Sequence, residues 1–240
     1  MRYLITIFVF ILSLASAANF SMPTYTSNLT SVKNGYGKVI DSPDIIIGSS
    51  GIVMHTFNNG ESSIIARAVV TDKSAGFATV RFEVFQALSQ PALPVPGILP
   101  KVGDKVILNY LYNRALIVVP NEEIYTQIIN SFPNIHFINP DLAASHLNAY
   151  RKPNPSRDDF RKICAQTVAG LIFIAMDKKA VFADCGSFEI LKSFETGEVK
   201  NYQVPFFSNV YGISPAWWKW DSAYIANYNK HYKFLLDIKD

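Results

Sequence analysis

The two cysteines are the residues of this sequence whose chemistry is easiest to state. Cys164 and Cys185 are its only cysteines, and an exported protein with two cysteines tends to pair them. A disulfide that closes the loop between Cys164 and Cys185 would stabilise the fold by about 3 kcal/mol in the chain-entropy model. Two free buried thiols are the alternative. A thiol nucleophile would need a nearby base and an exposed, electropositive site, whereas Cys185 ends an apolar run. We therefore predict a Cys164–Cys185 disulfide.

Other chemistry-bearing residues form no catalytic or metal-binding pattern. None of the four histidines has a second histidine or a carboxylate at metal-ligand spacing. The two serines between Gly48 and Gly51 lack the G-x-S-x-G spacing of a nucleophile elbow, and no glycine-rich phosphate loop is found. We expect no enzyme activity, no metal and no cofactor.

Three tryptophans near the end of the sequence are candidates for partner binding. Trp217, Trp218 and Trp220 form a dense aromatic cluster, and such clusters anchor partner proteins. The alternative, which we favour, is that they fill a seam between two parts of the fold.

The N-terminus predicts export. Arg2 precedes an almost unbroken apolar run over residues 3–14, and Ala15-Ser16-Ala17 resembles a cleavage site. The run is shorter than the roughly 20 residues of a membrane span, so we expect residues 1–17 to be a signal peptide rather than a retained helix. No membrane span is expected after cleavage. With 22 Lys and Arg against 19 Asp and Glu, the chain lacks the large excess of positive charge that is typical of nucleic-acid-binding proteins. We expect a periplasmic, outer-membrane or cell-surface location.

The first half of the sequence predicts strands. Residues 18–43 are polar and are expected to form a flexible leader ending in a strand near 36–40. Residues 44–120 alternate apolar runs with turns, including those at 58–60 and 73–76. In the strand starting at residue 77, the apolar set Ala78, Val80, Phe82 and Val84 is expected to face the core. A turn at Asn113-Arg114 is expected to join the last two strands into a hairpin that completes a small antiparallel barrel.

Residues 121–240 predict a compact α/β layer. Helices are expected after the caps Asn121, Asn139 and Ser156. A short strand is expected near 134–138 and three more over 170–176, 179–185 and 188–195. A terminal helix over 221–238 would bury one apolar face, made of Ile225, Tyr228, Tyr232, Leu235 and Leu236. The fold class is therefore α+β, with a small antiparallel barrel, an α/β layer and a C-terminal helix.

Several segments together resemble a known family. They include "LNYLYNRALIVVPN", "DDFRKICAQ", "FADCGSFEIL" and "YNKHYKFLLDI", and their order and spacing resemble the N-terminal domain of the plasminogen-binding proteins PgbA and PgbB, exported proteins of epsilonproteobacteria. The resemblance covers roughly residues 20–238.

The resemblance implies a non-catalytic envelope protein that binds host plasminogen, whose kringle domains capture lysine. Lys230, Lys233 and Lys239 are then the candidate binding residues. The alternative is a structural or accessory periplasmic protein whose partner is another envelope protein, for example in the flagellar basal body.

Overall fold

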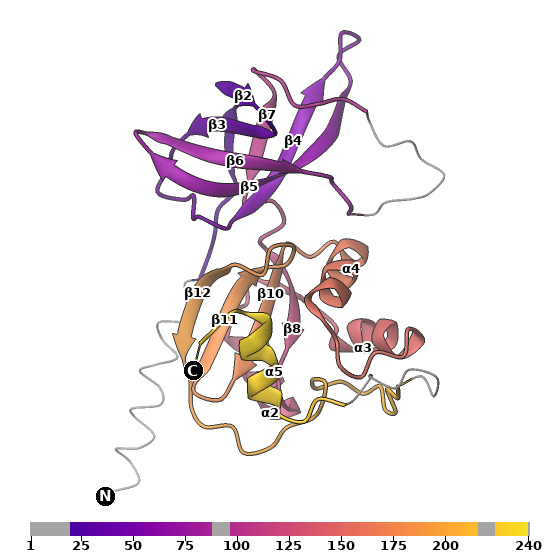
Figure 1. The fold of residues 1–240 in the computed structure, drawn as a ribbon. Coiled ribbons are helices and arrows are strands. Elements are labelled where there is room, and N and C mark those ends of the chain that lie inside the picture. The colour runs from indigo at the N-terminus through magenta and orange to yellow at the C-terminus, as the bar shows by residue number, and fades with distance from the viewer. Residues whose placement is uncertain (1–19, 88–96, 216–223, 240) are drawn as a thin grey trace, which may run out of the picture.

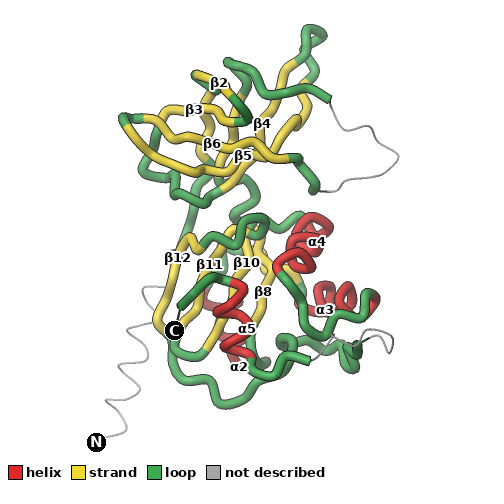
Figure 2. Tube along the Cα trace, in the orientation of Figure 1, coloured by secondary structure: helices red, strands yellow, loops and turns green. Residues whose placement is uncertain are grey.

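The computed structural model describes residues 20–87, 97–215 and 224–239, which build two β-sheets, one above the other in the view of Figure 1. All of the helices in these residues lie with the lower sheet, and the upper part of the molecule consists of strands and loops (Figure 2). The predicted α+β class is confirmed. Among the described residues, no helix has the length and apolar character needed to cross a membrane.

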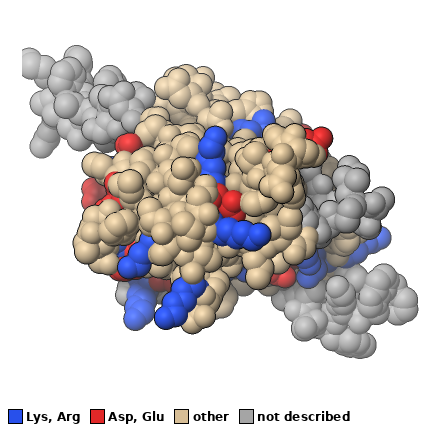
Figure 3. All heavy atoms as spheres, turned by 90° about the horizontal axis from the view of Figure 1, so that it is seen from above, with Lys and Arg blue, Asp and Glu red and all other residues tan. Residues whose placement is uncertain are grey.

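The first sheet is antiparallel and curls into a half-barrel. Its strands are β1 (Tyr25–Asn28), β2 (Ser31–Lys33), β3 (Tyr36–Ile40), β4 (Ser50–Thr56), β5 (Ser62–Ser74), β6 (Phe77–Glu83) and β7 (Lys105–Leu108). They are ordered β1-β7-β4-β5-β6-β3-β2. The curl brings β1 toward β3, where the Tyr25 hydroxyl donates to the Ile40 carbonyl at 3.0 Å. Seen from above this sheet, acidic side chains lie among the basic ones (Figure 3).

The second sheet is mixed. Its strands are β8 (Arg114–Val118), β9 (His136–Ile138), β10 (Leu171–Met176), β11 (Lys179–Asp184) and β12 (Ile190–Glu195), ordered β12-β11-β10-β8-β9. β8 runs parallel to β9 and β10, and the other pairs are antiparallel. Every residue of β10 is buried, as expected of a central strand that is covered on both faces.

Helices cover both faces of this second sheet. One face packs against α3 (Pro140–Ala149), α4 (Arg157–Thr167) and α5 (Tyr228–Leu235) through residues such as Leu147, Phe160 and Tyr232. The other face packs against α2 (Glu122–Ser131), and Phe20 stacks on Phe182 with ring centroids 4.1 Å apart. The expected caps are present, because the side chains of Asn121, Asn139 and Ser156 each accept a backbone N–H of the following turn.

The hairpin predicted at Asn113-Arg114 is wrong. β7 lies in the first sheet and β8 in the second, so residues 109–113 cross between the sheets instead of turning back. Asn109 and Leu111 adopt positive φ angles of 55° and 61° in this crossover. Local periodicity misses the crossover because both flanking runs are apolar and β-branched, which suits either kind of connection.

Three further expectations need correction. The polar segment 18–43, predicted as a flexible leader, contributes β1 and β2 as well as the expected β3. Val84 is 65% exposed rather than in the core, because β6 ends at Glu83. The last helix begins only at Tyr228, where Asn227 caps it, although its predicted apolar face is buried. Residues 1–17, predicted to be a signal peptide, and the three tryptophans lie outside the described residues.

Candidate functional site

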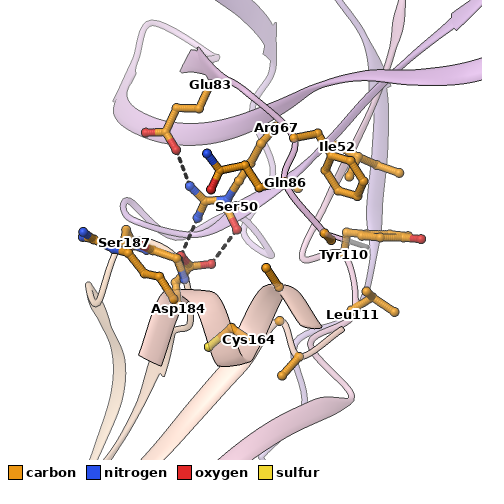
Figure 4. Close-up of a pocket in the computed structure, with 18 of the residues that line it drawn as sticks. Ser50, Ile52, Arg67, Glu83, Gln86, Tyr110, Leu111, Cys164, Asp184 and Ser187 are labelled. Carbon is orange, nitrogen blue, oxygen red and sulfur yellow. Dashed lines mark hydrogen bonds and ion pairs between the residues drawn. The ribbon is translucent and has the colours of Figure 1, made fainter. Parts of the chain in front are cut away.

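A cleft of about 750 Å³ lies between the two sheets. Its upper wall comes from β4, β5 and β6, and carries Ile52, Arg67 and Glu83. Its lower wall comes from α4 and from the turn that follows β11, as the close-up in Figure 4 shows. The sheets thus supply the frame, and loops supply much of the lining.

Asp184, the last residue of β11, is the centre of a buried polar network at the back of this cleft. Its side chain is 1% exposed. One carboxylate oxygen accepts from Ser50 Oγ at 2.5 Å and from the Tyr112 hydroxyl at 2.9 Å. The other oxygen accepts from Arg67 Nη2 at 2.6 Å and from two backbone N–H groups. Those two groups belong to Gly186 and Ser187, in the turn after β11. The network therefore joins the second sheet to β4 and β5 of the first.

Arg67 carries the matching positive charge. Its Nη1 donates to Glu83 on β6, while Arg81 Nη2 donates to the other Glu83 oxygen at 2.7 Å. Burial opposes the charge on Arg67, but Asp184 and Glu83 outweigh it and raise the pKa of its guanidinium. Burial likewise opposes the charge on Glu83, yet the hydrogen bonds and charges of the two arginines lower its pKa. Arg67 and Glu83 therefore stay ionised and paired with each other at neutral pH.

Tyr112 belongs to the crossover and connects it to the network. Its hydroxyl accepts from the Ser50 backbone N–H at 2.7 Å and donates to Asp184. Burial, together with the negative charge of Asp184, raises the pKa of Tyr112 well above its ordinary value. The phenol therefore remains a donor at neutral pH, which holds the crossover against the end of β11.

A disulfide and two hydrogen bonds fix the turn after Asp184. A disulfide joins Cys185 to Cys164 on α4, and the Cys185 N–H donates to the Gly170 carbonyl at 3.0 Å. Arg161 Nε, also on α4, donates to the Gly186 carbonyl at 2.5 Å. The disulfide predicted from the sequence is present, and its position fixes the turn that supplies two of the donors to Asp184.

This geometry suits a structural joint better than a catalytic centre. Both oxygens of Asp184 are occupied by donors, so the carboxylate has no free acceptor with which to take a proton from a substrate. His55 Nδ1 lies 2.7 Å from Asp104, but that carboxylate is buried and also accepts the Lys101 N–H. Within the described ranges, no group of three or more His, Cys, Asp or Glu side chains is placed to hold a metal ion.

Asp104 and Arg114 are charged residues that lie just before β7 and at the start of β8, and neither is fully exposed. Asp104 is buried, and Arg114 donates to the carbonyls of Thr167 and Val168 at 3.0 Å each, at the end of α4. Arg114 thereby satisfies carbonyl groups that a helix end leaves without internal partners. Both residues have structural roles.

The lysine candidates differ in their surroundings. Lys230 and Lys239 are exposed, whereas Lys233 is partly buried and engaged. Among the described residues, no acidic side chain lies within ion-pair distance of Lys230. Phe234 lies one turn further along α5 and is 76% exposed. The structure thus distinguishes three lysines that the sequence treated alike.

Sequence patterns missed the network because its members are far apart in the chain. Ser50 and Asp184 are separated by 134 positions, and Arg67 and Asp184 by 117. The only local signal is Asp184 at the end of an apolar run, followed by Cys185.

Comparison with known proteins gives a consistent result. The family model described as "Plasminogen-binding protein pgbA N-terminal" matches residues 24–236. Two curated proteins of Helicobacter pylori, from strains J99 and 26695, are both named plasminogen-binding protein PgbA. They are 33% and 32% identical to this chain over 180 residues, which cover 73% of this chain and 39% of each relative. The chain therefore spans about two fifths of the length of these relatives.

Proposed function

The chain belongs to the family of the N-terminal domain of plasminogen-binding protein PgbA, and on that premise we propose that it is an exported, non-catalytic binding protein of the cell envelope whose partner is host plasminogen. The family match over residues 24–236 is the observation that carries this proposal. The network around Asp184 supports its non-catalytic part, because Arg67 is committed to both Asp184 and Glu83.

Lysine is the group through which such a partner would be captured, and Lys230 is the best-presented of the three candidates. It lies on α5, whose inner face buries Tyr228, Tyr232 and Leu235. The end of this helix is held by Arg157, whose Nε donates to the Leu235 carbonyl at 2.5 Å. The ammonium of Lys230 is therefore displayed on a rigid element, which lowers the entropic cost of binding.

Phe234 adds an apolar platform beside Lys230. Residues four apart on a helix lie on the same face, so the exposed ring and the lysine stem are neighbours. A lysine-binding pocket that combines carboxylates with aromatic walls would contact both. Lys233 is engaged with the protein, and Lys239 follows the helix rather than lying on it.

Surface plasmon resonance tests the proposal. The purified protein is immobilised and plasminogen is passed over it, with and without a soluble lysine analogue. We expect saturable binding that the analogue abolishes. Binding that persists unchanged in excess analogue would contradict lysine capture, and absence of binding would contradict the proposed function as a whole.

Location is a separate part of the proposal. Plasminogen is outside the cell that makes this protein, so the binding surface must be reached from outside. Protease treatment of intact producing cells, followed by immunodetection, is expected to remove the protein. Full protection in intact cells, with digestion after lysis, would contradict host binding and favour the periplasmic accessory role.

A further inference from the structure

Two arginines face the cleft from opposite walls, and much of their hydrogen-bonding capacity is unused. Arg81 on β6 is 46% exposed, and its side chain has one partner among the described residues, the Glu83 carboxylate. Arg161 on α4 is 41% exposed. It donates one N–H to the Gly186 carbonyl and lies 3.6 Å from the well-solvated Asp158. Each guanidinium has five N–H donors, so most of them remain available in the cleft.

The carboxylates that line the cleft do not use up these donors. Asp184 is paired with Arg67, and Glu83 is shared between Arg67 and Arg81. Asp158 and Glu189 are exposed to solvent and add negative charge at the rim. Glu83 itself shows how this wall receives a carboxylate, because each of its oxygens accepts from a different arginine. Carboxylate recognition of this kind is what paired guanidinium groups favour.

Apolar side chains also line the cleft. Val84 has the alternation of a core residue but is 65% exposed and lines the cleft. Tyr110, Leu111 and Val168 line it as well, and all three are only partly buried. Apolar surface next to arginine donors is typical of sites that bind another protein.

We propose that this cleft binds a segment of a partner protein in which a carboxylate is flanked by apolar side chains, with Arg81 and Arg161 receiving the carboxylate. Val84 and its apolar neighbours contact the flanking side chains. Glu83 competes with the incoming carboxylate for Arg81, so it limits the affinity of the site. This inference is independent of plasminogen binding, because it uses acidic groups of the partner and not lysines of this chain.

Fluorescence anisotropy with three labelled peptides tests the proposal. The probe is a fluorescein-labelled peptide of alternating leucine and glutamate, and its controls replace every glutamate by glutamine or by lysine. We expect the glutamate peptide to bind at least tenfold more tightly than either control, since charge-assisted hydrogen bonds are the stronger ones. Equal binding of the three peptides would overturn the proposal. So would binding of vesicles containing phosphatidylglycerol with no binding of the glutamate peptide.

Variants on the two walls give effects of opposite sign. R81Q and R161Q are each expected to weaken binding of the glutamate peptide by about tenfold, as loss of a charged hydrogen bond does. E83Q is expected to strengthen it, because it frees Arg81 and removes a negative charge. R151Q, an exposed site outside the cleft, is expected to leave the affinity unchanged.

NMR of the arginine Nε–Hε groups makes the result independent of how the variants fold. Titration of the wild-type protein with the glutamate peptide is expected to shift the Nε–Hε signals of Arg81 and Arg161 while that of Arg151 stays in place. Binding without shifts at Arg81 and Arg161, or unchanged affinity in folded R81Q and R161Q, would overturn the assignment.

Discussion

Replacing Asp184 by asparagine tests whether the buried network joins the two sheets. Asparagine has nearly the same shape and keeps one acceptor oxygen, but it carries no charge. Asp184 accepts five hydrogen bonds, two of them from the side chains of Arg67 and Ser50 on the first sheet. In D184N the Arg67 charge is left mostly buried, with Glu83 as its remaining partner.

The expected cost follows from the burial of this pair. Removing one partner of a buried ion pair costs about 3–5 kcal/mol, because the other charge is left uncompensated. Asparagine retains some of the hydrogen bonds and Glu83 retains part of the charge pairing, so we expect about 3 kcal/mol. That is a large share of the roughly 5–15 kcal/mol by which a typical domain is stable.

Urea unfolding at pH 7, followed by circular dichroism, measures the loss. E189Q is the matched control, since Glu189 is an exposed acid near the same turn, and its effect should stay within about 0.5 kcal/mol. A loss below about 1 kcal/mol for D184N would refute the reasoning. A double-mutant cycle with R67Q should show strong coupling, and additive effects of D184N and R67Q would also refute it.

Three other predictions concern separate parts of the fold. The C164S/C185S variant should lose about 3 kcal/mol of unfolding free energy, and intact mass of the wild type should rise by two hydrogens on reduction; an unchanged mass would remove the disulfide. Burial lowers the pKa of His231, so the folded state holds it neutral where the unfolded chain binds a proton. Its contribution to stability is present above pH of about 6.5 and is lost as the pH falls below that value. The free energy of unfolding, measured in urea, should therefore fall more between pH 8 and pH 5 for the wild type than for H231Q. An equal fall in both proteins would contradict this. G51A should cost about 2–3 kcal/mol in urea unfolding, because a Cβ there would lie 2.0 Å from a backbone carbonyl of β7. A Cβ at Gly97 would meet no atom of the described residues within 4 Å, so G97A is the control and should be neutral.

Local signals in the sequence predicted most of the second sheet and its helices. Asn121, Asn139 and Ser156 cap helices as expected, since a cap depends on residues within one turn. The apolar runs that became β10 and β11 were also recognised as strands. The family resemblance, carried by several segments in order, is confirmed by the family model.

What the sequence could not show depends on contacts between distant residues. The runs that became β7 and β8 suit a hairpin as well as a crossover, and only the pairing of whole sheets decides between them. Asp184 meets Ser50, Arg67 and Tyr112 only after both sheets have formed. Val84 follows the strand alternation but lies beyond the last paired residue of β6.

The affinity of K230A for plasminogen tests the central claim most directly. Measured by surface plasmon resonance beside the wild type, K230A is predicted to raise the Kd by about tenfold, the effect of losing one charged contact. K162A, which removes an exposed lysine from α4, is predicted to leave the Kd unchanged. Equal affinities of K230A and K162A, or a larger loss in K162A, would contradict the assignment of Lys230 on α5 as the lysine that plasminogen captures.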